Sequence, residues 1–517
     1  MRQNQGVRTS RGWWWLSGIV TGALGLTVSY LVAGILRVRE SPVVAVAEGI
    51  TALTPGAIAE WAIQTLGRWD KTVLVIGIVV VLALVFGQLG RAARTRYWVA
   101  VLGYVLLAAI GLVAVLAKPA TTIVDLLPVA VGLLAWLVAL AVSVELLRRW
   151  ELVESTGDED DPTHSRRGVI VAIGAMAGVA AISGLLGRVA ISGRRRVEES
   201  RRLLRLDDVT APKLPSGVKV GVDGVTSWLT PADDFYLIDT AYIKPTIEPA
   251  DWQLRIHGMV ERELLLSYND LIAREITQDW ITLNCVSNPV GGDLIGNAWW
   301  SGVRLAGLLA EAGPLDGADA VLQTSDDGWS CGTPLVALMD DRNAMLAVAM
   351  NGQPLPIEHG FPVRTIVPGL YGYVSACKWV VDIEVTRFAD IEAYWTSKGW
   401  AEMGPVKMSS RIDVPGSGDD VAAGEVVVGG MAWSQHTGIA SVEVSLDGGA
   451  WTPATLGTVP NIDTWVQWRL TLDVEEGEHE LRVRATDKDG TAQTGVERDV
   501  LPDGATGWHT TTFSASA

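Results

Sequence analysis

The sequence predicts a chain of three parts: a multi-span α-helical membrane anchor, an α+β domain and an all-β sandwich. The chain has 517 residues, 49% of them hydrophobic, and its long apolar runs lie before residue 190. Short strand-like and helical runs alternate up to about residue 400, and only strand-like runs follow. We therefore assign 1–190 to the anchor, 191–224 to a linker, 225–400 to the α+β domain and 401–517 to the sandwich.

The anchor is predicted from five apolar runs, each long enough for a spanning helix of about 20 residues. The runs are Trp13–Leu36, Thr72–Gly90, Tyr97–Ala117, Ile123–Leu147 and Gly168–Gly187. A signal peptide is the alternative interpretation of the first run. It is disfavoured because further spans follow and no small-residue cleavage site is evident. We expect a multi-pass membrane protein.

Arginines between the runs predict the orientation of the anchor. Arg91, Arg94 and Arg96 separate the second run from the third, and Arg148 and Arg149 follow the fourth. Because positively charged ends of spans stay in the cytoplasm, these ends and the N-terminus belong inside. With five spans and the N-terminus inside, the part of the chain after the fifth run lies outside the cytoplasm. The anchor itself lies in the cell membrane.

A pair of arginines precedes the fifth run, in the sequence Ser165-Arg166-Arg167. It resembles the twin-arginine export signal, placed inside the chain. An ordinary pair of positive-inside arginines explains it equally well, and the sequence leaves both interpretations open. The export interpretation implies that the outer part crosses the membrane already folded.

Composition excludes several classes of function. The net charge of −17 and the lack of a basic stripe argue against a nucleic-acid partner. Three cysteines are too few for a four-thiolate iron–sulfur cluster or zinc site. No histidine falls in an apolar run, where it would be needed to ligate a haem. We therefore interpret the anchor as a platform rather than a redox centre.

The rest of the chain is predicted from short elements. In the α+β domain we expect strands at Trp252–Ile256, Ile281–Leu283, Val321–Thr324, Arg364–Val367 and Lys378–Val385, and helices at Tyr268–Arg274 and Leu305–Ala312. In the sandwich we expect strands at Val426–Trp433, Ile439–Leu446, Trp465–Leu472 and His479–Ala485. Asp-Gly turns separate the sandwich strands, as in hairpins, and we interpret this part as an interaction module.

One thiol stands where a predicted buried strand ends. Cys285 follows Trp280–Leu283 and precedes a turn-rich segment that ends at Gly292. A free cysteine at such a place is a nucleophile, a soft metal ligand or a small core residue. Composition alone favours the core residue. A nucleophile would need a base, for which His359 is a candidate, and an orienting third group, which is not identifiable.

Residues downstream have the chemistry of an anion-binding site. A proline-rich turn carries His359, a strand carries Arg364, and a Tyr-Gly-Tyr turn is followed by Ser375 and Lys378. A planar guanidinium, a point charge and exposed N–H groups are what a phosphate binds. Each residue alone would more often be a surface residue or a core residue whose polar groups are hydrogen-bonded. Their delivery from turns beside a thiol-bearing loop indicates a binding site.

These segments resemble the sulfite oxidase family of molybdenum enzymes. The resemblance rests on His359–Arg364 (His-Gly-Phe-Pro-Val-Arg), Val367–Gly369 (Val-Pro-Gly) and Lys378–Trp379, with a single cysteine on an upstream strand end. Gly430–Trp433 and Val442–Gly449 resemble that family's immunoglobulin-like dimerisation domain. The anchor lies outside the resemblance.

The resemblance implies a mononuclear molybdenum centre with a single molybdopterin. Cys285 would be the protein ligand of molybdenum, and a thiolate suits a soft, high-valent metal. The other sulfur ligands would be the dithiolene pair of the pterin. The remaining site residues that it implies are the cofactor-binding Phe235, Tyr236, Asp326, His359, Arg364, Ser375 and Lys378, and the catalytic Trp400.

The sequence departs from the family where sulfite-oxidising members bind their substrate. Those members have an Arg-Asn-His run where this chain has Ile238-Asp239-Thr240, and arginines soon after the ligand cysteine where it has Pro289-Val290. Their active-site tyrosine falls on Trp400. Because a buried dianion without cations is costly to desolvate, the resemblance implies the fold and the cofactor but not sulfite as substrate.

We therefore expect a membrane-anchored, extracytoplasmic, molybdopterin-dependent oxidoreductase that transfers an oxygen atom or two electrons. A pocket walled by Trp400 and poor in cations suits a neutral or weakly charged substrate such as a sulfoxide. The alternatives are a reductase of methionine sulfoxide in proteins and a cofactor-free, membrane-anchored binding module. The expected partners are a separate electron carrier or the quinone pool, and a second copy of the chain in a homodimer. The pairing of Cys331 with Cys377 is left open.

Overall fold

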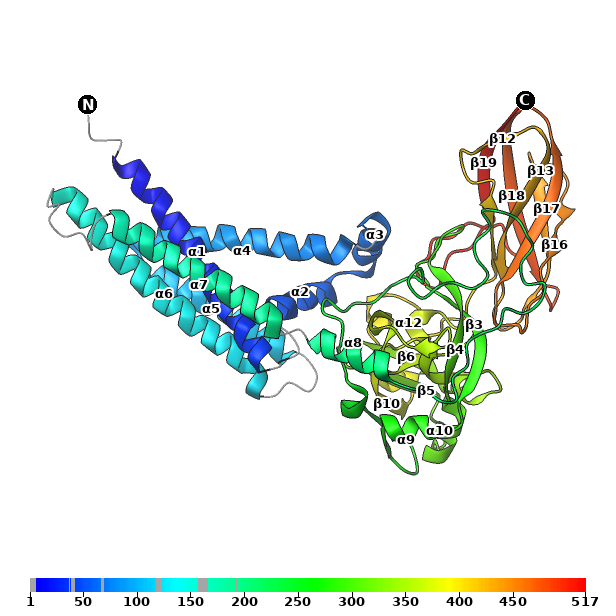
Figure 1. The fold of residues 1–517 in the computed structure, drawn as a ribbon, viewed down its shortest axis with the longest axis horizontal. Coiled ribbons are helices and arrows are strands. Elements are labelled where there is room, and N and C mark those ends of the chain that lie inside the picture. Colours follow the sequence, from blue (N-terminus) through cyan, green and yellow to red (C-terminus); the bar gives the residue numbers. More distant parts are fainter. Residues whose placement is uncertain are drawn as a thin grey trace. The chain divides into compact units, whose positions relative to one another are not determined.

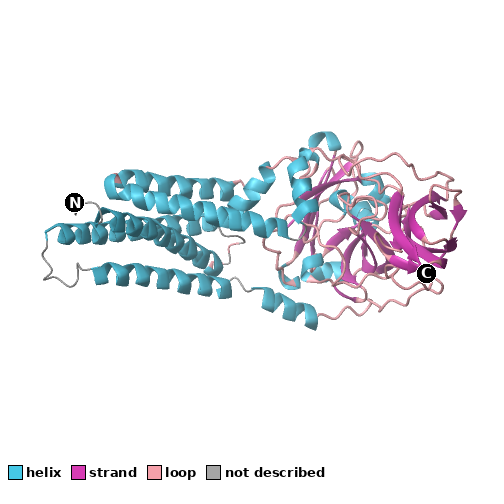
Figure 2. Ribbon diagram, turned by 90° about the horizontal axis from the view of Figure 1, so that it is seen from above, coloured by secondary structure: helices cyan, strands magenta, loops and turns pink. Residues whose placement is uncertain are grey.

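The computed structural model describes residues 6–36, 38, 42–66, 69–117, 123–156, 166–190 and 193–517. The chain divides into two compact units, Met1–Arg196 with Ala241–Ile243, and Val197–Thr240 with Lys244–Ala517. The first unit is helical (Figure 1), and Figure 2 shows that the strands lie in the second. Ser165 of the twin-arginine motif lies outside the described residues.

The first unit is a set of helices at the predicted runs. Its helices are α1 (Gly6–Ile35), α2 (Pro42–Leu53), α3 (Gly56–Leu66), α4 (Asp70–Thr95), α5 (Tyr97–Leu116), α6 (Ile123–Thr156) and α7 (Arg166–Ala190). Five are long and apolar enough to cross a membrane, over Arg11–Ile35, Lys71–Thr95, Tyr97–Leu116, Ile123–Leu152 and Arg167–Arg188. The helices predicted at the five runs are therefore confirmed, and their length and composition suggest a membrane anchor.

Close approach at glycine joins α1 to its neighbours. A Cβ added at Gly22 would lie 2.1 Å from the ring of Phe86 in α4, so this contact requires glycine. Trp136 of α6 donates its indole N–H to the Gly22 carbonyl at 2.9 Å. Tyr104 of α5 packs against both rings, with centroids 5.7 Å from Phe86 and 5.4 Å from Trp136. Small residues and aromatic rings thus pack this bundle closely, as in helices that associate in lipid.

The α+β part of the second unit has two sheets, of order β2-β1-β10-β5-β6 and β3-β4-β7-β8, with β9 paired to β7. The strands are β1 (Gln253–Gly258), β2 (Leu264–Ser267), β3 (Thr277–Asn284), β4 (Ile295–Arg304), β5 (Ala320–Ser325), β6 (Ser330–Pro334), β7 (Met345–Met350), β8 (Gln353–Pro354), β9 (Arg364–Ile366) and β10 (Val380–Thr386). The helices are α8 (Gly193–Leu203), which leads into this unit, α9 (Tyr268–Ile272), α10 (Leu305–Ala312), α11 (Leu335–Met339) and α12 (Gly372–Ser375).

The elements predicted in this part are confirmed, with two boundary corrections, because helix α9 ends at Ile272 and not at Arg274 and strand β10 starts later than predicted. Strand β10 begins at Val380 and not at Lys378. The reason is local: Trp379 has a φ of 51°, a left-handed conformation that cannot continue a strand. Lys378 instead forms an isolated bridge with Arg364.

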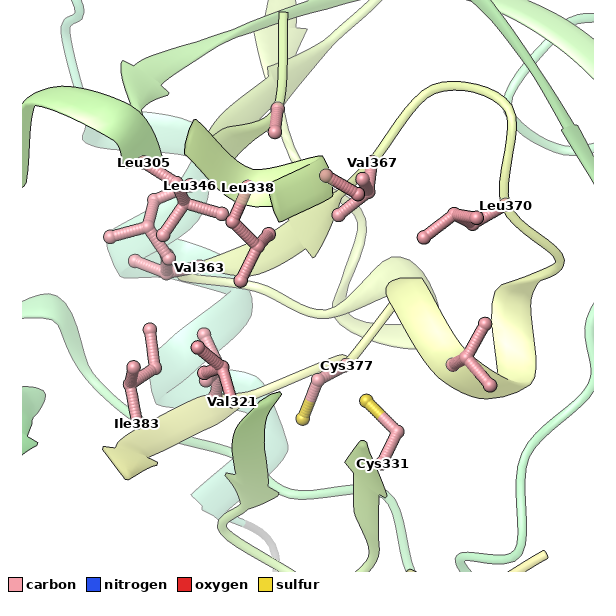
Figure 3. Close-up of a cluster of buried hydrophobic side chains, with 14 of the residues drawn as sticks. Leu305, Val321, Cys331, Leu338, Leu346, Val363, Val367, Leu370, Cys377 and Ile383 are labelled. Atoms are coloured by element: carbon pink, nitrogen blue, oxygen red, sulfur yellow. The ribbon is translucent and has the colours of Figure 1, made fainter. Parts of the chain in front are cut away.

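A hydrophobic core of this part contains two of the three cysteines. Figure 3 shows Cys331 and Cys377 among buried leucines, valines and isoleucine, with their sulfur atoms pointing toward each other. Both are free thiols and 0% exposed. Burial and the neighbouring Cys331 thiol raise the pKa of Cys377 above its usual range. In this structure both cysteines are therefore core residues and not a disulfide.

The last part of the chain forms two sheets, β11-β13-β17-β16 and β12-β19-β18-β14-β15. The strands are β11 (Ser409–Val414), β12 (Asp420–Ala422), β13 (Gly424–Trp433), β14 (Ile439–Leu446), β15 (Thr452–Pro453), β16 (Thr455–Leu456), β17 (Val466–Val474), β18 (Gly477–Asp487) and β19 (His509–Ser516). Apolar side chains from both sheets share one core, which includes Val428, Trp468 and Phe513. The predicted strands are confirmed, while the likeness to an immunoglobulin domain stays a prediction.

Two sets of contacts join this two-sheet part to the rest of the second unit. Trp228 and Trp465 each donate an indole N–H to the other's carbonyl, at 3.2 and 2.9 Å. Upstream, Val218 is 1% exposed and the Thr458 N–H donates to the Gly217 carbonyl at 2.9 Å. The end of the expected linker therefore packs as an arm of the folded unit.

Candidate active site

Cys285 lies directly after β3, at the start of a loop that returns to β4. Its N–H donates to the Leu294 carbonyl at 2.9 Å, and the Leu294 N–H donates to Oδ1 of Asn288 at 2.9 Å, so the loop is closed at its base. Cys285 is 9% exposed, whereas Cys331 and Cys377 are 0% exposed. Its thiol is therefore the one that lies at an edge of the core.

His359 lies on a 3-10 turn, η4 (Ile357–His359), and is 3% exposed. Its Nε2 lies 2.9 Å from the Ala232 carbonyl, which can only accept, so Nε2 carries the proton. Burial, with the charges of Lys378 and Arg364, lowers the pKa of His359 to about 4. The neutral ring leaves Nδ1 as a hydrogen-bond acceptor.

Arg364 begins β9 and is 4% exposed. Its guanidinium stacks over Trp300 at 5.3 Å, and Nη1 donates to the His359 carbonyl at 3.2 Å. Burial lowers the pKa of Arg364 to about 10. No carboxylate pairs with it among the residues that the structure describes, so a buried positive charge faces the site without a counter-charge from the protein.

Lys378 has a counter-charge that sequence reasoning missed. Its Nζ donates to Oδ2 of Asp239 at 2.9 Å, and Lys244 hydrogen-bonds to the other oxygen of the same carboxylate. Burial lowers the pKa of Lys378 to about 8, although Asp239 opposes this shift. Asp239 was noted only as a departure from the family, because 139 residues separate it from Lys378 and the sequence carries no signal of that pairing.

Phe235 and Tyr236 form an aromatic wall beside these charges. The Phe235 ring packs edge-on against His359, with centroids 5.6 Å apart, and against Trp300 at 5.8 Å. Burial and the Cys285 thiol raise the pKa of Tyr236, while Arg364 opposes the rise. The structure thus brings Phe235, Tyr236, His359 and Arg364 together in one neighbourhood that includes Cys285.

Three further predicted residues lie at the margin of this neighbourhood. The Ser375 hydroxyl is 2.9 Å from the Tyr371 carbonyl and 3.1 Å from the Leu370 carbonyl, so it points back into its own turn. Asp326 follows β5, and its N–H donates to the Trp379 carbonyl at 2.9 Å. Trp400 is 4% exposed and packs against Tyr373, with centroids 5.8 Å apart. Their roles in the site stay predictions.

Tyr371 is a wall residue that sequence reasoning quoted without a role. It is 4% exposed, and its hydroxyl accepts from the Lys407 N–H at 3.2 Å. Burial raises the pKa of Tyr371 to about 12, and the charges of Cys285 and Asp503 add to the rise. The sequence signal that could have identified Tyr371 as a site residue was its place in the Tyr-Gly-Tyr turn just before Lys378.

Two buried groups of the site fit a bound molybdopterin. Arg364 offers a buried guanidinium without a carboxylate partner among the described residues, which suits a phosphate. The Trp400 indole N–H is buried with no hydrogen-bond partner among the described residues. A thiol, a free guanidinium, a lysine and a neutral histidine with one acceptor nitrogen make a donor set that suits a metal-bound pterin with a phosphate.

Comparison with known proteins identifies the class first. Residues 241–395 match the family model described as oxidoreductase molybdopterin binding domain. The matched segment contains Cys285, His359, Arg364 and Lys378. The chain thus contains the molybdopterin-binding domain of a molybdenum cofactor-dependent oxidoreductase.

Relatives then give the family. The chain is 30% identical to sulfite oxidase of Gallus gallus over 340 residues, which cover 54% of this chain and 72% of the relative. It is 28% identical to mitochondrial sulfite oxidase of Homo sapiens over 306 residues, 50% of this chain and 55% of the relative, so it spans about half that relative's length. The sulfane dehydrogenase SoxCD of Paracoccus pantotrophus has a similar structure, with a TM-score of 0.50, 25% identity and coverage of 57% of this chain and 85% of that one. The chain belongs to the sulfite oxidase family of molybdopterin oxidoreductases.

Proposed function

We propose that this protein is a membrane-anchored, extracytoplasmic oxidoreductase that transfers an oxygen atom or two electrons at a molybdenum held by Cys285. The observation that carries the proposal is Arg364, a buried guanidinium with no carboxylate partner in the described part of the chain, which acts on Tyr236 together with the Cys285 thiol. When bound, a single molybdopterin supplies the two-electron chemistry. The protein's own residues bind and orient it.

Each residue has a distinct part in this binding. Arg364 and Lys378 would hold the phosphate, one as a planar fork and the other as a point charge already positioned by Asp239. His359, fixed by its bond to Ala232, would accept an N–H of the pterin at Nδ1. Phe235 and Tyr236 would exclude water from the edge of the site.

The proposed substrate is a small, uncharged sulfur compound such as a sulfoxide. The named relatives are a sulfite oxidase and a sulfane dehydrogenase, which supports sulfur chemistry. The positions where sulfite-oxidising relatives carry arginines are Ile238 and Pro289-Val290 in this chain. Arg411 reaches the same loop but is paired with Asp413 at 2.7 Å, so its charge is not available to a dianion.

The proposal also includes an electron partner, a homodimer and a route of export across the membrane. Electrons would reach the site from a separate carrier or the quinone pool, and the sandwich would form a homodimer. The arginine pair Arg166-Arg167 would direct export of the folded outer part.

Metal and pterin analysis of the purified protein tests the proposal. We expect molybdenum and one molybdopterin per chain, followed by turnover in a screen of sulfoxides with artificial electron donors. Absence of molybdenum, under conditions where another enzyme of this family is loaded, would contradict it.

A further inference from the structure

We propose that Arg411, a residue of the sandwich, is a positioning residue for the loop that follows Cys285. Residues 286–293 are called the ligand loop below. The inference deepens the proposed function and rests on it only for the role of Cys285 as a metal ligand. It gives the sandwich a part in the active site in addition to its predicted role in dimer formation.

The Arg411 side chain is fixed on three sides. It lies on β11 and is 7% exposed. Its Nη1 donates to the Gly292 carbonyl of the ligand loop at 2.6 Å, Nη2 to the Thr226 hydroxyl at 2.8 Å and Nε to Oδ1 of Asp413 at 2.7 Å. The second oxygen of Asp413 accepts from the Thr226 N–H at 2.9 Å. The guanidinium therefore presents one N–H to the loop in a single, well-defined direction.

A second sandwich residue packs against the neighbouring position of the loop. Gly291 has a φ of +77°, and a Cβ added there would lie 2.2 Å from the His509 ring. The ring itself is held, because its Nδ1 accepts from the Ile412 N–H at 3.0 Å. Arg411 and His509 thus clamp the two glycines at the tip of the ligand loop.

The clamp acts at the tip of the loop, whereas backbone hydrogen bonds hold its base. Its base is closed by the bond between Cys285 and Leu294, and a turn joins the Gly292 N–H to the Pro289 carbonyl at 2.9 Å. Two successive glycines at the tip carry high conformational entropy, which the bond to Arg411 restricts. Cys285 directly precedes the loop, and its carbonyl accepts from the Asn288 N–H at 3.1 Å. Movement of the loop would therefore be transmitted to the residue that carries the thiol.

The test compares the full-length protein with Arg411→Gln, in cofactor-free form, by the rate at which a small alkylating reagent modifies Cys285. Cys331 and Cys377 are 0% exposed, so mass spectrometry reports on Cys285. Loss of a charge-assisted hydrogen bond should speed the modification by about tenfold or more. Arg484→Gln is the matched control, because it breaks a sandwich ion pair, with Glu443 at 2.8 Å, on β18 and β14. The control should leave the rate unchanged.

Gly291→Ala gives an independent perturbation if Arg411→Gln fails to fold. Its methyl group would press on His509 and should also speed modification of Cys285, and His509→Ala in the same chain should reverse part of the effect. In cofactor-loaded protein, Arg411→Gln should keep its molybdenum but shift the electron paramagnetic resonance signal of the metal and lower kcat more than it changes KM. Equal modification rates in Arg411→Gln, Gly291→Ala and the control would overturn the proposal. Faster modification of Cys285 in Arg411→Gln, in a protein that never binds molybdenum, would support the clamp and contradict the proposed function.

Discussion

Arg364 is buried, and its hydrogen bonds go to the carbonyl groups of His359 and Thr365. A charge in that position costs stability until an anion joins it. We therefore expect Arg364→Met to raise the stability of the cofactor-free protein by about 1 kcal/mol or more and to abolish retention of the cofactor. Thermal unfolding and pterin analysis measure the two effects.

Arg411→Met is the matched comparison for this experiment. It would leave Asp413, whose side chain is 7% exposed, without its cation, and should destabilise the protein by about 3 kcal/mol. Equal destabilisation by both substitutions would show that a group of the protein itself compensates the charge of Arg364.

His359 makes the cofactor-free protein sensitive to acid. Its pKa is about 4 in the folded chain and 6.5 as an ordinary value, so protonation favours the unfolded state. The contribution is fully present above about pH 6.5 and is lost as the pH falls toward 4, on the order of 3 kcal/mol in all. His359→Gln should flatten this part of the stability curve in unfolding measured from pH 7.5 to 4.

Substitution of Cys285 shows whether its thiol is a metal ligand or a core residue. Serine is nearly the same size, so Cys285→Ser should leave the fold and the unfolding temperature nearly unchanged. If the thiolate binds molybdenum, turnover should fall below detection and the X-ray absorption spectrum of the metal should lose one sulfur ligand. Cys331→Ser is the control, since it places a hydroxyl in the core and should affect stability but not the metal.

At the level of elements, local pattern predicted most of the strands that carry the site, because each is an apolar run bounded by turns. Strand β10 shows the limit, since the left-handed Trp379 that delays its start is not visible in the residue types. Strand β4, which pairs with β3, and strand β7, which pairs with β4, were missed, and both are buried runs whose period does not identify them. The contacts of Asp239 with Lys378 and of Arg411 with Gly292 span more than a hundred residues, and no local rule finds such pairs.

We propose that the ligand loop restricts what the site can bind. Val290 is partly exposed, and Pro289 beside it offers no charge. We expect negligible sulfite oxidation by the unmodified protein and by Trp400→Tyr, because the tyrosine restores a donor without a positive charge. Val290→Arg combined with Trp400→Tyr should lower the KM for sulfite by about tenfold or more, because one charge-assisted contact supplies that much binding free energy. Efficient turnover of sulfite by the unmodified protein would mean that another cation reaches the substrate.

At the scale of the whole molecule, function depends on parts that are distant in sequence. The proposed site residues lie in the α+β part, while Arg411 of β11 and His509 of β19 contact the loop after Cys285. Trp228 and Trp465 further join these parts through paired indole bonds. A boundary drawn near residue 400 therefore separates two folding patterns but not two independent functions.

The orientation of the chain in the membrane is the remaining question at this scale. Helices long enough to span lie at five places, and arginines between them predict an N-terminus inside. The second unit would then face outward, with Lys213 exposed on the irregular segment that follows α8. Trypsin added to intact spheroplasts should cut after Lys213, giving a C-terminal fragment on a denaturing gel, and Lys213→Gln should prevent this cut. If the fragment forms only after the membrane is broken, the second unit faces the cytoplasm and the proposed export is wrong.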